Sequence, residues 1–198
     1  MDLKTKTHQV LANQYQNKPF NSPNKVIQSS QGCIYFSDPD YGYNQGFKPK
    51  PQLPQSIYAF HPNKEGIHLI SRDFSLPHGL GLSGNHHQLY ISDTAATDEK
   101  SPYNPKKTKG ILVATLIKPT KISQPKFLLQ VPTGIPDGFV VTPNNELWVA
   151  AGDGVRHYSS AGKLLDKIPI PQGAINLTMG HQVLYVTADT AIYHIALK

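Results

Sequence analysis

One short pattern occurs four times in this sequence and limits the folds that it can adopt. Each copy starts with a turn, continues with a short apolar segment, passes a second turn rich in Gly, Asn or Ser, and ends in another apolar segment. Apolar segments this short, bounded by turn residues, are typical of β-strands rather than helices. The second apolar segments of the four copies are Ile34–Asp38, Leu89–Asp93, Leu147–Ala151 and Leu184–Ala188.

An aromatic residue occupies the same place in each of these segments, and its spacing predicts the fold class. Tyr35, Tyr90, Trp148 and Tyr185 are roughly 40 to 60 residues apart, which is the period of β-propeller blades. We expect all four side chains to pack in the core. No helical stripe with a 3.6-residue apolar period is present. The sequence therefore predicts an all-β protein, a β-propeller with four recognisable blades.

The copies also predict how the chain is divided. Residues 1–19 are expected to hold one strand, His8–Ala12, and a connector. The four repeats span about 20–72, 76–131, 134–170 and 173–198, and the last supplies only three strands. Two loops, Tyr41–Pro54 and Thr94–Lys109, are too long to be simple hairpin connections. His8–Ala12 is a candidate for the missing strand of the last repeat, in which case it would close a four-bladed ring.

The amino-acid composition limits which binding partners we expect for this protein. The formal net charge is +6, with Lys106, Lys107 and Lys109 in one loop, but no aromatic-rich basic module is visible, so we expect no nucleic-acid partner. Cys33 is the single cysteine, which excludes an internal disulfide. Because neither a signal peptide nor a membrane-spanning apolar segment is apparent, we expect a cytoplasmic protein without membrane association.

Residues 134–155 contain the carboxylate of greatest chemical interest. Pro136-Asp137-Gly138 predicts a rigid turn that holds the Asp137 side chain just ahead of a strand at 139–142. Further along, Asp153-Gly154 predicts a tight hairpin turn. Asp before Gly is also a common pair in purely structural turns, so both roles for Asp137 stay open.

Repeats around an axis bring equivalent turns together even when they are far apart in the sequence. Asn24, His78, Asp137 and Asn176 occupy such turns, and one carboxylate among amide oxygens is a donor set for a hard metal cation. Asn24 can instead cap a turn through its side chain, and His78 can be a turn or lining residue.

The loops that join the second and third strands open on the same side as these turns. This topology places five further side chains near a shared mouth: Asp40, Tyr41, Tyr43, Tyr103 and Lys107. Asp38, at the end of a strand, is a candidate lining residue, and the alternative is that Asp38 and the equivalent Asp93 accept hydrogen bonds from backbone groups.

Four motifs resemble one known family. They are Phe20-Asn-Ser-Pro-Asn24, Ser37-Asp-Pro-Asp-Tyr-Gly42, Ile135-Pro-Asp-Gly138 and Leu147-Trp-Val-Ala-Ala-Gly-Asp-Gly154. Together they resemble the gluconolactonase/regucalcin (senescence marker protein) family, especially its lactonohydrolase-like branch, from about Val10 to the end of the chain. The resemblance implies a six-bladed propeller that holds one divalent cation, usually calcium, on its axis. It also implies hydrolysis of lactones, and some relatives hydrolyse organophosphates.

Roles for individual residues follow from the resemblance. It implies that Asn24 and Asp137 are metal ligands and that Asp137 is also the general base or nucleophile. At a third ligand position the family has the Asn of a Pro-Asn-Gly turn, where this chain has His78. The implied function is a calcium-dependent lactonase or ester hydrolase acting on a small lactone or ester. Its expected substrate-lining residues are Asp38, Tyr41 and Asn176.

Three departures from the family keep other functions open. Imidazole is a poor replacement for an amide oxygen on calcium, the segment that carries the family's Glu ligand is not recognisable, and Lys25 stands where relatives carry Asp. One alternative is a non-catalytic propeller remnant or binding module. The other is a fragment completed by another chain, since unpaired blade edges favour self-association.

Overall fold

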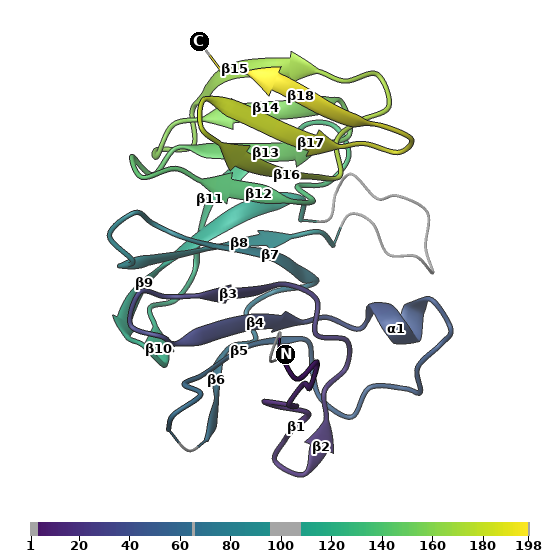
Figure 1. The fold of residues 1–198 in the computed structure, drawn as a ribbon, viewed down its shortest axis with the longest axis vertical. Coiled ribbons are helices and arrows are strands. Elements are labelled where there is room, and N and C mark those ends of the chain that lie inside the picture. The colour runs from purple at the N-terminus through teal and green to yellow at the C-terminus, as the bar shows by residue number, and fades with distance from the viewer. Residues whose placement is uncertain (1–3, 65, 96–107, 198) are drawn as a thin grey trace.

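The computed structural model describes residues 4–64, 66–95 and 108–197. Over these residues the chain forms four antiparallel sheets that follow one another as the blades of a four-bladed β-propeller (Figure 1). The predicted all-β class and propeller fold are therefore confirmed. No helix in this part of the chain is both long and apolar enough to cross a membrane. Lys106 and Lys107 lie outside the described residues.

Blades 1 and 2 form the first half of the molecule. Blade 1 pairs β3 (Val26–Gln28), β4 (Ile34–Asp38), β5 (Ser56–Phe60) and β6 (Ile67–Ser71) in that order. The short helix α1 (Tyr41–Asn44) lies in its long β4–β5 loop. Blade 2 pairs β7 (Pro77–Leu82), β8 (Gln88–Asp93) and β9 (Gly110–Lys118), and both β10 (Lys121–Ile122) and β11 (Lys126–Gln130) then pair with β9.

Blades 3 and 4 form the second half. Blade 3 pairs β12 (Phe139–Val141), β13 (Leu147–Ala151), β14 (Gly154–Tyr158) and β15 (Leu164–Pro169). Blade 4 pairs β16 (Asn176–Gly180), β17 (Val183–Thr187) and β18 (Ile192–Ala196), so its three strands match the prediction for the last repeat.

The hairpin turn of blade 3 is one residue earlier than the sequence predicted. Ala151 pairs with Gly154, so Gly152 and Asp153 are the two turn residues and Gly154 already belongs to β14. Gly154 has a φ of +121°, and a Cβ there would lie 2.2 Å from the carbonyl oxygen of Ile168 on β15. This glycine is needed for the close approach of two strands rather than for the turn.

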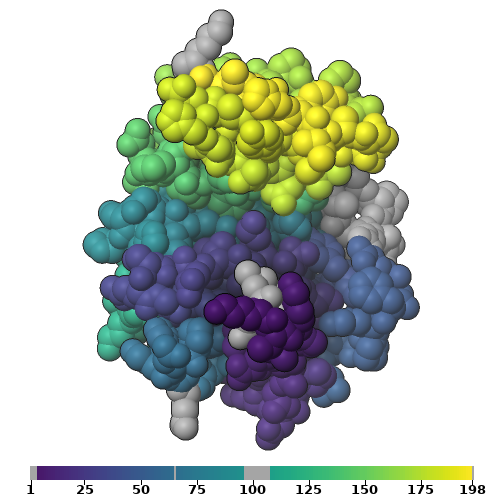
Figure 2. Space-filling model, viewed as in Figure 1, coloured from purple at the N-terminus to yellow at the C-terminus, as the bar shows by residue number. Residues whose placement is uncertain are grey.

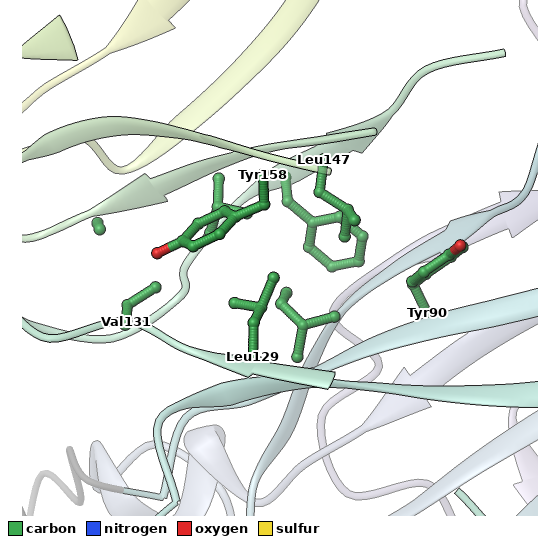
Figure 3. Close-up of a cluster of buried hydrophobic side chains, with 9 residues drawn as sticks. Tyr90, Leu129, Val131, Leu147 and Tyr158 are labelled. Atoms are coloured by element: carbon green, nitrogen blue, oxygen red, sulfur yellow. The ribbon is translucent and has the colours of Figure 1, made fainter. Parts of the chain in front are cut away.

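Three hydrophobic clusters join successive blades. Cys33, Tyr35 and Ile57 of blade 1 pack with Leu80 and Leu89 of blade 2. A second cluster joins blades 2 and 3, with side chains of both meeting between the sheets (Figure 3). The third joins blades 3 and 4. Because middle blades are covered on both faces, their second strands are almost continuously apolar, which is why those segments were recognisable in the sequence.

The predicted burial of the repeated aromatic is correct in three blades and wrong in the fourth. Tyr35 and Tyr90 are each 1% exposed and Trp148 is 8% exposed, whereas Tyr185 is 46% exposed. Along β17, Leu184 and Val186 face blade 3 and Tyr185 faces the other way. No further blade covers that face in the described part of the chain, so its aromatic lies at the surface.

The N-terminal prediction also needs correction. His8–Ala12 forms no strand, and the first strands are β1 (Gln14–Tyr15) and β2 (Lys18–Pro19), which pair with each other. Ala12 and Tyr15 pack on the outer face of blade 1, in a cluster that contains Phe36. Figure 2 shows this purple segment on the half of the molecule away from the yellow blade 4. It therefore does not complete blade 4, because it is held by apolar contacts with blade 1.

Candidate functional site

A cavity of about 480 Å³ lies where the turns that open blades 1, 2 and 3 meet. Its wall includes Asn24 before β3, His78 in β7 and Asp137 before β12. The β4–β5 loop contributes Tyr41 and Lys48 from the other side. Three of the four turns expected to converge therefore line this cavity, as the propeller geometry requires.

Asp137 is fixed by its own backbone. Its N–H donates to the carbonyl of Ala150, and the N–H of Ala150 donates to the carbonyl of Gly138, at 3.1 and 2.8 Å. The N–H of Gly138 donates to the carbonyl of Ile175, which ties the turn to blade 4 as well. Burial raises the pKa of the Asp137 carboxyl, and the nearby His78 imidazole opposes this rise.

His78 faces Asp137 from the neighbouring blade. Its Nε2 lies 3.4 Å from Oδ1 of Asp137, and its ring meets the edge of Tyr41 at a centroid distance of 5.7 Å. Its carbonyl accepts a 2.7 Å hydrogen bond from the Ser37 hydroxyl of blade 1. Its buried Nδ1 has no hydrogen-bond partner among the described residues.

The short distance between these two blades depends on Gly79. A Cβ at this position would lie 2.9 Å from the Phe139 ring and 2.9 Å from the Ser92 hydroxyl. Without a side chain, β7 can approach β12 closely enough to bring His78 beside Asp137. The Gly79 N–H also donates to the Ser92 hydroxyl at 2.7 Å, which holds the strand in this position.

Asn24 and Tyr41 complete the wall near this pair. The backbone N–H of Asn24 donates to the carbonyl of Ser37 at 3.0 Å, so its position is set by β4. The Tyr41 hydroxyl is hydrogen-bonded to the Thr94 hydroxyl at 2.9 Å, which links the loop of blade 1 to blade 2. Tyr41 therefore lines the cavity as predicted from topology.

Two predicted lining residues do not line this cavity. Asp38 is fully buried, and its carboxylate accepts hydrogen bonds from the backbone N–H groups of Asn21 and Ser22 at 3.0 and 2.8 Å. Burial raises its pKa to about 6, although both hydrogen bonds favour the charged form. Asn176 is exposed in β16, and its side-chain oxygen accepts a 2.8 Å hydrogen bond from the N–H of Leu177.

Asp93, which is the equivalent of Asp38 in blade 2, also accepts hydrogen bonds from backbone groups. Asp93 accepts hydrogen bonds from the N–H groups of Ser75, Leu76 and Ala95 at 2.9 to 3.1 Å. In both blades, the aspartate that ends the second strand thus holds the segment that precedes the first strand. This repeated contact positions the turns that carry the cavity wall.

Lys48 was missed by sequence reasoning. Its ammonium donates a hydrogen bond to the carbonyl of Asn21 at 2.5 Å, and it lies in the wall between the loop and blade 1. The only sequence signal was its place in the long loop predicted to reach the mouth. Tyr103 and Lys107, predicted near the same mouth, lie outside the described residues.

The side chains of this cavity do not fit calcium. Calcium in proteins takes about six to eight oxygen ligands, whereas the pair at the centre of this wall supplies one carboxylate and one imidazole nitrogen. Across residues 4–64, 66–95 and 108–197, no three His, Cys, Asp or Glu side chains form a metal-binding group. The nitrogen of His78 stands next to Asp137 where a hard cation requires another oxygen.

Comparisons with known proteins agree with this fold. The family profile described as SMP-30/Gluconolactonase/LRE-like region matches residues 1–190. The chain is 26% identical to the gluconolactonase of Zymomonas mobilis over 212 residues, which cover 100% of this chain and 56% of that protein. It is 30% identical to lactonohydrolase oryL of Aspergillus oryzae over 97 residues, or 48% of this chain and 22% of that protein.

Solved structures of other proteins share this fold. A gluconolactonase from Xanthomonas campestris superposes with a TM-score of 0.83 at 29% identity, covering 96% of this chain and 61% of that one. Regucalcin from Agrobacterium tumefaciens, a calcium-binding protein, superposes with a TM-score of 0.61 at 17% identity, covering 83% and 52%, which indicates a shared fold. The chain spans little more than half the length of these relatives.

Proposed function

Because this chain belongs to the SMP-30/gluconolactonase/LRE-like family, we propose that its cavity binds and hydrolyses small lactones or related esters. One observation carries the proposal: a carboxylate and an imidazole from different blades, Asp137 and His78, face each other at 3.4 Å in the cavity wall. The volume of about 480 Å³ lies within the range of small-molecule sites. The named relatives support a lactone as the substrate class.

In this proposal, Asp137 is the general base. It accepts a proton from water while the water oxygen attacks the lactone carbonyl carbon, and the ring C–O bond then breaks as the ring oxygen is protonated. The raised pKa of the buried Asp137 carboxyl makes its anion a stronger base than an exposed aspartate. His78 lies within reach to stabilise the charge of Asp137 and to exchange a proton with the departing ring oxygen.

Other wall residues would bind the substrate. The amide of Asn24 and the ammonium of Lys48 supply N–H donors for the hydroxyls of a sugar lactone or for the oxyanion formed on attack. The Tyr41 ring gives an apolar surface beside His78. The mechanism uses groups of this chain alone, because the side chains present do not fit the calcium ion that the family resemblance implies.

A second candidate function is a binding module completed by another chain. Both outer faces of the four-bladed unit carry exposed apolar side chains, including Val26 at 64% exposure in blade 1 and Ile192 at 77% in blade 4. Such faces favour association. This reading predicts a cavity without hydrolytic activity in the isolated chain.

The test compares wild type with Asp137→Asn on a panel of γ- and δ-lactones, with acid release measured at constant pH. We expect hydrolysis by the wild type and a loss of at least about a hundredfold in kcat/KM in the variant, the usual size of a general-base contribution. Asp166→Asn is the matched control, since Asp166 is an exposed carboxylate of β15 outside the cavity. Equal activity of Asp137→Asn and wild type would remove Asp137 from the mechanism.

A further inference from the structure

A second cavity, of about 390 Å³, lies between blades 1 and 2. It is lined by the turn that joins β3 to β4, by the β5–β6 turn, and by Pro119 and Thr120 between β9 and β10. These turns are at the opposite ends of their strands from the cavity of Asp137, and β10 lies on the side of the molecule opposite to α1 (Figure 1). The second cavity is therefore a separate space, and its volume is within the range of small-molecule sites.

The wall of the second cavity carries positive charge. Lys64 comes from the β5–β6 turn, His68 from β6 and Lys118 from the end of β9. None of these three side chains forms an ion pair with another described residue. The described lining also contains no Asp or Glu, whereas the first cavity contains Asp137. The two cavities therefore differ in charge.

The most deeply buried lining residue is neutral. Cys33 is 1% exposed, and its Sγ lies 3.6 Å from the Pro119 carbonyl oxygen. Burial raises the pKa of the Cys33 thiol, whereas a hydrogen bond with Tyr35 and the positive charge of Lys64 oppose the rise. The field of the Lys64 ammonium thus reaches the innermost part of the cavity, where Cys33 and Pro119 offer apolar contacts.

The wall that carries Lys64 is held in place by His61. Nδ1 of His61 accepts a 3.2 Å hydrogen bond from the Asn63 N–H, so Nε2 carries the proton of the neutral ring and donates to the Gln31 carbonyl at 3.1 Å. This ring therefore ties the β5–β6 turn to the β3–β4 turn. The Lys64 N–H also donates to the His61 carbonyl at 3.0 Å. A preorganised wall loses little conformational entropy when it binds a ligand.

Ammonium groups around a partly apolar cavity suit a ligand that has both a negative charge and an organic body. We propose that the second cavity binds a small organic anion, whose phosphate or carboxylate group is held by Lys64, Lys118 and an N–H of His68. The organic part of the ligand contacts Cys33 and Pro119. This inference goes beyond lactone hydrolysis and does not depend on it, because it uses a different cavity.

The affinity is expected to be moderate. Both lysine side chains are exposed, and water and salt screen the interactions of exposed charges. We therefore expect a Kd of about 0.1–1 mM at low ionic strength and clearly weaker binding at about 0.5 M salt.

The test is isothermal titration calorimetry with three probes: glucose 6-phosphate, glucuronate and uncharged glucose. We expect one or both anions to bind and glucose not to bind, and the comparison shows whether phosphate or carboxylate is preferred. The double variant Lys64→Gln/Lys118→Gln should weaken anion binding at least about tenfold, because it removes two charged donors. The matched control is Lys126→Gln/Lys163→Gln, which removes the same charge from exposed residues outside the cavity and should bind as the wild type does.

Three results would overturn the inference. The first is the absence of binding by both anions, or binding of glucose with the same affinity. The second is an equal loss in the two double variants, which would assign binding to net charge alone. The third is a loss in Lys48→Gln with none in Lys64→Gln/Lys118→Gln, which would place the anion in the cavity of Asp137. Lactone hydrolysis is tested separately through Asp137→Asn, so failure of either proposal leaves the other intact.

Discussion

Replacement of Asp38 by Ala tests the claim that this carboxylate holds the fold rather than the substrate. The change leaves two buried backbone N–H groups, those of Asn21 and Ser22, without their acceptor. Each such loss costs about 1–3 kcal/mol. Removal of the buried charge offsets part of this cost, because a rise in pKa from 3.8 to about 6 corresponds to about 3 kcal/mol at neutral pH. We expect a net loss of at most about 3 kcal/mol in the free energy of unfolding at pH 7.

The pH dependence of the free energy of unfolding gives a second test of the role of Asp38. A carboxyl whose pKa is raised in the folded state contributes most stability below its unfolded pKa, and the contribution is lost as the pH rises through about 6. Wild type therefore gains stability between pH 7 and pH 4, through Asp38, and Asp38→Ala does not. The difference between the two proteins should grow by up to about 3 kcal/mol over this interval.

Urea unfolding at several pH values measures both effects. Asp93→Ala is the matched comparison, because Asp93 holds the equivalent segment of blade 2 through three N–H groups. We expect it to destabilise by about 3 kcal/mol or more. A stability of Asp38→Ala equal to that of wild type at every pH would refute the structural role of Asp38.

Two further predictions concern packing. Gly79→Ala places a Cβ 2.9 Å from Phe139 and Ser92, so we expect a loss of about 1–3 kcal/mol in the free energy of unfolding. Thermal melts measure this loss, with Gly180→Ala, whose nearest contact is 3.3 Å, as the control. Tyr90→Ser removes a side chain that is 1% exposed and should cost about 3–5 kcal/mol, whereas Tyr185→Ser at the exposed equivalent position should change stability by about 0.5 kcal/mol or less. Equal effects of the two tyrosine substitutions would contradict the assignment of the outer face of blade 4.

The sequence predicted the blades well because their inner segments carry a strong local signal. Leu147–Ala151 is buried along its whole length, and such a segment can be recognised without knowing its neighbours. His8–Ala12 contains three apolar residues but forms no strand: Val10 and Leu11 are 68% and 57% exposed, and only Ala12 packs on the apolar cluster of blade 1. Tyr185 was wrongly placed for a related reason: burial depends on a neighbouring blade that the repeat itself does not encode.

The sequence predicted only those features of the site that follow from the geometry of the repeats. Asn24, His78 and Asp137 occupy equivalent turns, so their convergence followed from the fold. The separation of His78 from Asp137 depends on the packing of Gly79 against Phe139, a contact between blades that no local pattern shows. Lys48 lies in a loop whose conformation is set by its contacts with the segment before β3.

The dependence of lactone hydrolysis on pH tests the central claim most directly. Burial raises the pKa of Asp137, so kcat/KM of the wild type should rise with pH through an ionisation above the ordinary aspartate value of about 3.8 and then level off. Rates are corrected for spontaneous hydrolysis and measured in parallel for Asp137→Asn. The account predicts that this rise disappears in the variant together with most of the activity. The same pH-dependent rise in Asp137→Asn as in the wild type would contradict the assignment of Asp137 as the base.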